Sequence, residues 1–110
     1  MDYITDIIRC YEADLQKVKK DGYTLRYVKE QTHELCLEAV KQAGYTLKLV
    51  KEQTPEICLA AVKNNGDAFL FVKEQTYEIC LAAAKQYGRA IQAIKDPLIL
   101  AQIKLELQLR

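Results

Sequence analysis

The sequence predicts an all-α protein, a short α-solenoid of stacked two-helix repeats with capping helices at both ends. Three observations carry this prediction. The four glycines recur every 22 residues, at Gly22, Gly44, Gly66 and Gly88. The segments that open at the first two glycines, residues 22–43 and 44–65, are identical at 15 of 22 positions. Each segment also carries the signals of two short helices, and an internal period of this length is typical of a solenoid.

Length and composition suit one soluble domain. Half of the 110 residues are apolar and 28% are charged. The 16 basic and 15 acidic residues leave a net charge of +1, which argues against a protein devoted to binding polyanions. The start of the chain lacks the pattern of a secretory signal, and no apolar run approaches membrane-spanning length. We therefore expect a cytoplasmic protein, in a bacterium or in a host cell, with no membrane partner.

Residues 1–21 form the predicted N-terminal cap. The apolar residues of segment 3–20 fall on one stripe, which predicts one long helix with a polar outer face. These residues are Ile4, Ile7, Ile8, Tyr11, Leu15 and Val18. A break in this helix near Thr5 and Asp6 is the alternative.

Three full repeats follow the cap, at residues 22–43, 44–65 and 66–87. The first helix of the second repeat is predicted from about Tyr45 to Glu52. Leu47 and Val50 form one apolar edge of it, at a spacing of three residues. Because only a glutamine and a threonine link the two helices, we expect them to be antiparallel neighbours.

The second helix of each repeat begins after a threonine, and in the second repeat it spans about Pro55 to Asn64. Thr54 is a good N-cap, and Pro55 suits the N1 position because its missing N–H is not needed there. Glu56 follows in the first turn, where its charge favours the helix dipole. Gly66 then stands at the C′ position, where helices commonly end. Helices this short need the stacking of units for stability.

Residues 88–110 form a degenerate repeat and a last helix. Asp96-Pro97 is a capping and N1 signal that predicts a helix, although the alternation from Ile103 to Leu109 also permits a strand. The apolar residues of this segment cover more than one face, so we expect an exposed interaction patch. Self-association as a homodimer is the simplest use of such a patch. The candidate residues are Leu100, Ile103, Leu105, Leu107 and Leu109.

The strings VKEQTPEICLAAVK and GYTLKLVKEQT resemble the short helical repeats of an uncharacterised family. That family is known only as a domain of unknown function, found in bacterial, prophage and viral proteins. The resemblance covers residues 22 to about 95. It implies the repeat fold and brings no activity, cofactor or site residue with it.

Three cysteines, Cys36, Cys58 and Cys80, recur at one position of the second helix. Equivalent atoms of stacked helices lie about 8–10 Å apart, whereas a disulfide needs Cα atoms within about 7 Å. Zinc sites use closer spacings such as C-x₂-C. We therefore predict small core residues with free thiols, which fit a reducing compartment, and we expect no metal or other cofactor.

His33 is the only histidine, and it is predicted to be an exposed N1 residue without a catalytic part. A general base needs a nucleophile or an orienting acid beside it, and the side chain of Glu34 points away. The sequence has no glycine-rich phosphate loop, no paired carboxylates and no metal-spaced cluster. We therefore expect no enzymatic activity.

Lysines recur at the ends of both predicted helices, in two rows: Lys29, Lys51, Lys73 and Lys95, and Lys19, Lys41, Lys63 and Lys85. Such rows could follow a phosphate backbone, as in helical-repeat RNA-binding proteins. A lysine in a last turn also favours the helix dipole, and an acidic residue follows each lysine of the first row. We favour the capping role and keep nucleic-acid binding as the alternative.

The positions that vary between units are the place to seek function, because the repeated positions build the scaffold. On the predicted first helices these positions carry residue types that are common at interfaces. The predicted partner-binding residues are Tyr23, Arg26, Tyr27, Tyr45, Lys48, Leu70 and Phe71. Alternatively, the tyrosines only cover the edge of the core. The leading hypothesis is a non-enzymatic protein–protein interaction module. Given where similar repeats occur, it would be a phage- or pathogen-borne factor that binds and inhibits a host protein.

Overall fold

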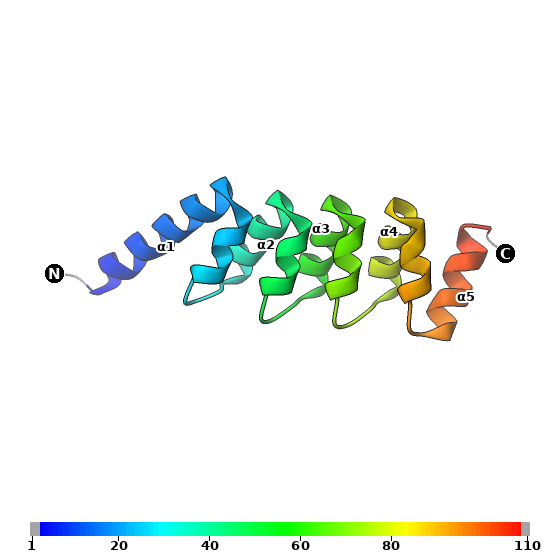
Figure 1. The fold of residues 1–110 in the computed structure, drawn as a ribbon. Coiled ribbons are helices and arrows are strands. Elements are labelled where there is room, and N and C mark those ends of the chain that lie inside the picture. The colour runs from blue at the N-terminus through cyan, green and yellow to red at the C-terminus, as the bar shows by residue number, and fades with distance from the viewer. Residues whose placement is uncertain (1–2, 109–110) are drawn as a thin grey trace.

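The computed structural model describes residues 3–108, and over these residues the chain is helical and has no strand. Its α-helices are α1 (Tyr3–Lys20), α2 (His33–Gln42), α3 (Pro55–Asn64), α4 (Tyr77–Gln86) and α5 (Pro97–Glu106). Four 3₁₀ helices alternate with them, η1 (Gly22–Tyr27), η2 (Gly44–Leu49), η3 (Gly66–Phe71) and η4 (Gly88–Ala93). Figure 1 shows these elements in chain order along one axis.

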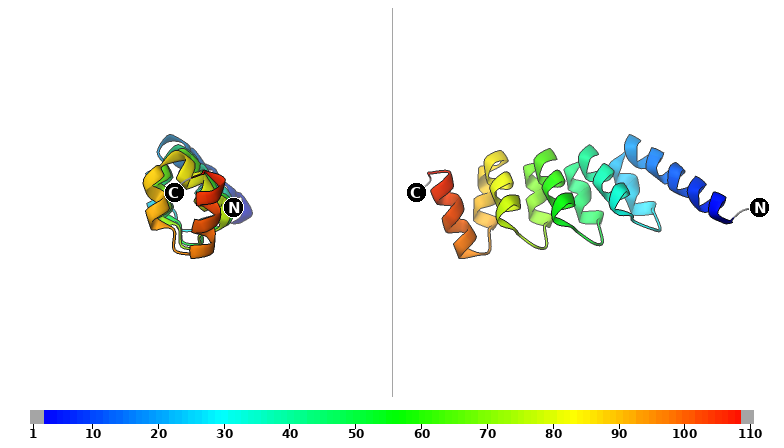
Figure 2. Two further views of the ribbon diagram at one scale, coloured as in Figure 1. Left: turned by 90° about the vertical axis from the view of Figure 1, so that its right-hand side faces the viewer. Right: turned by 180° about the vertical axis from the view of Figure 1, so that it is seen from behind.

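The elements stack into an elongated array. Each α-helix packs against its α neighbours, each η helix against its η neighbours, and α2, α3 and α4 contact the η helices on both sides. The molecule measures 64 × 21 × 16 Å, with a Cα radius of gyration of 16.4 Å. A compact domain of this length would have a radius of gyration of about 13 Å. Seen from one end, the units lie behind one another (Figure 2), so the predicted α-solenoid is confirmed.

The α-helices begin where the capping signals predict. The hydroxyl oxygens of Thr32, Thr54 and Thr76 accept hydrogen bonds from the N–H groups three residues on, at 3.1–3.2 Å. Pro55 is the first residue of α3. These side chains satisfy one of the free N–H groups at each helix start, which stabilises each helix by about 1 kcal/mol.

The first helix of each unit differs from its prediction in type and length. In the second unit it is the 3₁₀ helix η2, which ends at Leu49, so Lys51 and Glu52 lie beyond it. Val50 is extended, with φ −77° and ψ 122°. Short 3₁₀ helices are frequent as connectors between other elements, which is how η2 joins α2 to α3. The link to the second helix is therefore five residues long, 50–54, rather than two.

The core follows the 22-residue repeat. Each of the three full units buries at least two apolar residues of the η helix and its C-cap, and four residues of the following α-helix. In the second unit these are Leu47, Val50, Ile57, Cys58, Ala61 and Val62. Each unit packs against the next one, because a single unit cannot bury its apolar residues on its own.

Gly22 and Gly44 allow a close approach between backbones. None of them has a positive φ among the described residues. A Cβ atom at Gly22 would lie 2.6 Å from the carbonyl oxygen of Ala39, and one at Gly44 would lie 2.5 Å from that of Ala61. A side chain would therefore hold the η helix away from the following α-helix.

The two ends of the array depart from the repeat. Helix α1 runs without a break from Tyr3 to Lys20, so the alternative break near Thr5 and Asp6 is absent. Its N-terminal half projects beyond the stacked units (Figures 1 and 2). At the other end the segment after Asp96 is helical, as favoured over a strand, and Asp96 caps it through the Leu98 N–H.

Candidate interaction surfaces

The seven predicted partner-binding residues lie along the row of η helices, and we call them the first-helix surface. Contacts between η1 and η2, and between η2 and η3, bring residues from three units onto this one face. The exposed members are Arg26, Tyr27, Lys48 and Leu70, whereas Tyr23, Tyr45 and Phe71 are half-buried. Tyr27 is 80% exposed and Leu70 is 67% exposed, which is high for residues of their size.

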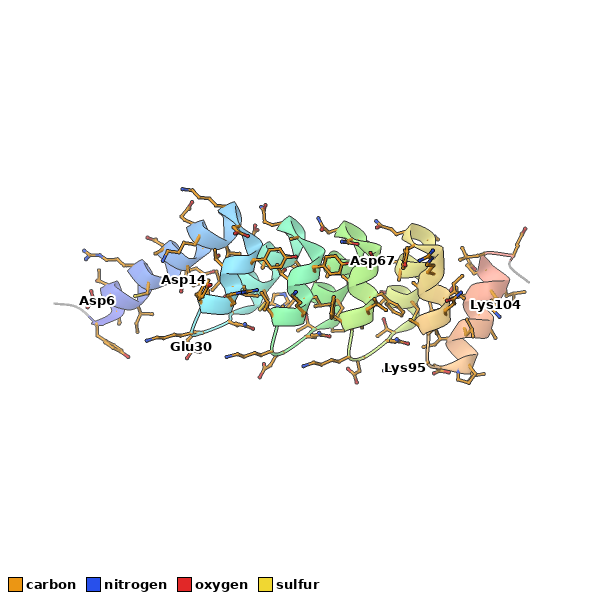
Figure 3. All side chains as sticks on the ribbon, viewed as in Figure 1. Asp6, Asp14, Glu30, Asp67, Lys95 and Lys104 are labelled. Atoms are coloured by element: carbon orange, nitrogen blue, oxygen red, sulfur yellow. The ribbon has the colours of Figure 1, made fainter. Side chains whose placement is uncertain are left out.

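The half-buried aromatic residues join neighbouring units. The Lys48 ammonium lies 5.9 Å from the centre of the Tyr23 ring. The Tyr45 ring packs edge-on against Phe71, with centres 5.8 Å apart. The Tyr45 hydroxyl also donates to the Asp67 carboxylate at 3.0 Å (Asp67 is labelled in Figure 3). That hydrogen bond, followed by burial, raises the pKa of Tyr45. These rings therefore serve the scaffold as well as the surface.

A shallow pocket of about 260 Å³ continues this surface toward η4. Phe69, Leu70 and Tyr87 supply its apolar lining, together with the exposed Arg89 and Gln92. The sequence prediction left out Arg89 and Gln92, although they occupy the same varying positions in the fourth unit. The pocket offers an apolar recess beside a cation.

The C-terminal candidates separate into core and surface. Ile103 is fully buried, so it belongs to the core and not to an exposed patch, whereas Leu105 is 81% exposed. Leu100 and Leu107 are half-buried, and Leu109 lies outside the described residues. Leu98 is 76% exposed, although it was not among the candidates. Leu98 and Leu105 are two helical turns apart, so the large exposed apolar residues of α5 lie along one narrow strip.

Sequence reasoning missed a repeated hydrogen-bonding device that we call the glutamine clamp. The Gln31 side chain donates to the Leu49 carbonyl at 2.8 Å and accepts from the Lys51 N–H at 2.9 Å. Gln53 bonds Phe71 and Lys73 in the same way, and Gln75 bonds Ala93 and Lys95. The identical glutamine in all three linkers was the available signal. Each clamp ties a linker to the backbone of the next unit.

The repeated cysteines are buried and free, as predicted. The Cys58 thiol lies 3.3 Å from the clamp oxygen of Gln53, and the Cys36 thiol lies 3.7 Å from that of Gln31. Burial raises the pKa of all three thiols and brings that of Cys80 to about 11. Protonated thiols in the core are poor nucleophiles and poor metal ligands.

His33 is the exposed first residue of α2, as predicted. Its partner is Glu56 of the next unit, with 3.0 Å between His33 Nε2 and the carboxylate. Glu34, the acid that is adjacent in sequence, accepts instead from the Tyr11 hydroxyl. The two contacts repeat at an interval of one unit, so they join successive helix starts.

The two lysine rows occupy different settings. Lys41, Lys63 and Lys85 lie in the last turns of α2, α3 and α4, as predicted. The other row lies in the linkers, after the η helices have ended, so its predicted last-turn position is wrong. In Figure 3, Glu30 and Lys95 lie on one edge of the molecule. Every linker carries a lysine followed by an acidic residue, so the two charges alternate along the sequence of linkers.

Two classes of site find no candidate within residues 3–108. No group of histidine, cysteine and carboxylate side chains in this range is arranged to hold a metal ion. No helix in it combines the length and the hydropathy that crossing a membrane requires.

A family model matches most of the repeat region of the chain. The family model described as a domain of unknown function (DUF4116) matches residues 33–77 and again residues 54–99. The two matches overlap, start about one repeat apart and together cover more than half of the chain. No curated protein and no solved structure matches the chain.

Proposed function

Because the chain belongs to the DUF4116 family, whose description names no activity, we propose a function from the molecular surface alone. The protein is a non-enzymatic module that binds another protein through its first-helix surface. In its most specific form, the proposal is a phage- or pathogen-borne factor that inhibits a host protein. Its four free thiols suit a reducing compartment, which favours the cytoplasm.

One observation carries this proposal: varying residues remain exposed on neighbouring η helices, whereas most of the repeated apolar and hydrogen-bonding residues serve the scaffold. Leucines, valines and cysteines of the repeat fill the core, threonines cap the helices and glutamines clamp the linkers. Arg26, Lys48 and Leu70 occupy one varying position on three adjacent η helices, and all three are exposed. A solenoid commonly binds its partner along such a row.

The chemistry of this row changes along the array. The first two units present the cations Arg26 and Lys48, and the third presents Leu70 beside the apolar pocket. A partner that fits would place a carboxylate near the cations and an apolar side chain in the pocket. Such anchors commonly account for most of the affinity of an interface.

Affinity capture from the native host cells tests the proposal when it is combined with surface variants. We expect Arg26→Glu with Lys48→Glu, and separately Leu70→Asp, to weaken binding of the captured protein at least about tenfold. The matched control is Lys51→Glu with Lys73→Glu, which makes the same charge change on the linker edge. Equal binding by all three variants would exclude the first-helix surface.

Nucleic-acid binding is the second candidate, and one observation favours it. The side-chain amides of Asn64 and Gln86 donate to the carbonyls of Lys41 and Lys63, at the ends of α2 and α3. Those carbonyls are therefore satisfied, and the lysine ammonium groups remain in solvent along one edge. A mobility shift that weakens steeply with salt would support this candidate over the protein-binding one.

Self-association through α5 is a separate proposal, carried by the exposed Leu98 and Leu105. Light scattering at two protein concentrations measures it directly. We expect a homodimer that Leu105→Asp returns to a monomer. A wild-type chain that stays monomeric at both concentrations would exclude this role for α5.

A further inference from the structure

Each glutamine clamp imitates the N–H and C=O groups of one residue of a neighbouring strand. Val50 is extended, and the carbonyl before it and the N–H after it both bond the carboxamide of Gln31. A single residue of an adjacent strand would form the same pair of bonds. The carboxamide supplies the same donor and acceptor as a backbone peptide, so the clamp joins two units as a one-residue bridge.

The first unit carries the same backbone pair without a clamp. Val28 is extended, with φ −80° and ψ 126°, close to the values of Val50. Neither the Tyr27 carbonyl nor the Lys29 N–H forms a hydrogen bond within the described part of the chain. The residue 22 positions before Gln31 is Arg9, which lies inside α1 and cannot serve as a clamp.

An apolar groove lies beside this open pair. It has a volume of about 610 Å³ between α1 and the first unit, and its lining includes Tyr3, Ile7, Tyr27 and Leu35. Tyr27 is exposed, whereas Leu49, Phe71 and Ala93, at the same position in later units, are half-buried. The open hydrogen-bonding pair and the exposed ring therefore both mark the place of a preceding unit.

We propose that this N-terminal end of the array binds a glutamine-bearing segment of another protein. The segment resembles the repeat's own linker, Val-Lys-Glu-Gln-Thr. Its glutamine carboxamide would bond the Tyr27 carbonyl and the Lys29 N–H, and its apolar residues would lie in the groove. The interface continues the one between successive units. Of the first-helix surface this site uses Tyr27 alone, so the proposal does not depend on the other six residues.

The occupant is a different chain and not the end of a second copy. All three linker glutamines of this chain are already engaged in its own clamps. The residue at the clamp position of the fourth unit is Pro97, the first residue of α5, and proline has no carboxamide. A head-to-tail array of identical chains therefore lacks the side chain that the site requires.

NMR titration with a synthetic peptide tests the site on the whole protein. The probe is residues 50–63 of this chain, VKEQTPEICLAAVK, under reducing conditions, and its matched control carries Gln53→Glu. We expect the probe to shift the Lys29 amide resonance and to leave the Lys51 amide unchanged, because Lys51 is already clamped. The glutamate peptide should bind at least about fivefold more weakly, since it cannot donate to the Tyr27 carbonyl.

Two protein variants check the groove. Ile7→Asp should weaken the probe at least about fivefold, whereas Ile8→Asp should leave it unchanged. Both side chains are 50% exposed on the same helix, but only Ile7 lines the groove. An unmoved Lys29 amide, equal binding of the two peptides, or equal effects of the two variants would each overturn the proposal. A wild-type dimer that Ile7→Asp dissociates would also overturn it, because a second copy would then fill the groove.

Discussion

Single residues in this array are selected by how closely neighbouring backbones approach. A Cβ atom at Gly44 would meet Ala61 and Asn65, whereas one at Gly88 would meet no atom of the described residues within 4 Å. The difference arises because the helix that follows Gly88 departs from the repeat and leaves that side open. The same position of the repeat therefore tolerates a side chain in one unit and excludes it in another.

We expect Gly44→Ala to lower the free energy of unfolding by about 1–3 kcal/mol, because the new methyl group would overlap a backbone carbonyl. Gly88→Ala is the matched control and should change it by less than about 1 kcal/mol. Urea unfolding followed by circular dichroism measures both. Equal losses would contradict the close-approach explanation.

The buried thiols make stability depend on alkaline pH. The pKa of Cys80 is about 11 in the folded chain, raised from an ordinary value near 9 by burial and by Asp96. Between these values the unfolded chain loses the proton more readily than the folded one, so stability falls as the pH rises. We expect Cys80→Ala to reduce this fall between pH 9 and 11. An unchanged slope in unfolding experiments would show that Cys80 is not its source.

At the scale of elements, the linkers are the parts that fasten one unit to the next. Each of the first three linkers contributes a glutamine whose two hydrogen bonds reach about 20 residues ahead, onto the following η helix and linker. The second helix of each unit is fastened by apolar packing and its threonine cap. Neighbouring units are therefore joined by hydrogen bonds at the linker and mainly by apolar packing at the α-helix.

Gln53→Ala should lower the free energy of unfolding by about 1–3 kcal/mol, because it leaves one backbone carbonyl and one N–H without partners. Gln42→Ala is the matched control, since Gln42 is exposed at the end of α2. Chemical unfolding of the two variants measures the difference. A loss at Gln42 as large as that at Gln53 would contradict a specific role for the clamp.

Helix α1 shows what happens where the linker signals are missing. Arg9 and Cys10 stand where later units have the clamp glutamine and the capping threonine. Without a cap or a clamp nothing ends the helix, and α1 continues through this point. The resulting overhang exposes Ile7 and Ile8 and forms one wall of the apolar groove.

At the scale of the whole molecule, contacts are confined to neighbouring units, so stability accumulates along one dimension. Deleting residues 44–65 removes one complete repeat and joins two equivalent positions. We expect a folded, shorter rod with a radius of gyration below the 16.4 Å of the full chain. Small-angle scattering and circular dichroism test this.

Deletion of residues 44–54 is the out-of-register control, because it joins non-equivalent positions. We expect the chain with this deletion to lose its cooperative unfolding transition. A half-unit deletion as stable as the whole-unit deletion would contradict the repeat as the unit of stability.

Much of the fold follows from local chemistry that can be read along the chain. The period of the glycines, the threonine caps and the Asp96-Pro97 signal are short-range features, and they set where the α-helices begin. The core positions follow as well, because apolar residues repeat at the same places in every unit. The first-helix surface was predicted from the same comparison of units, as the set of positions on the first helices that vary from one unit to the next.

The sequence by itself therefore determined the repeat, its boundaries and its buried positions. Only the tertiary structure showed the 3₁₀ form of the first helix, the partners of the glutamines and the burial of Ile103. The open backbone pair at Tyr27 and Lys29 also emerged there. These features depend on contacts between residues about 18–23 positions apart, or on which face of a helix its neighbour covers. A local sequence pattern contains neither kind of information.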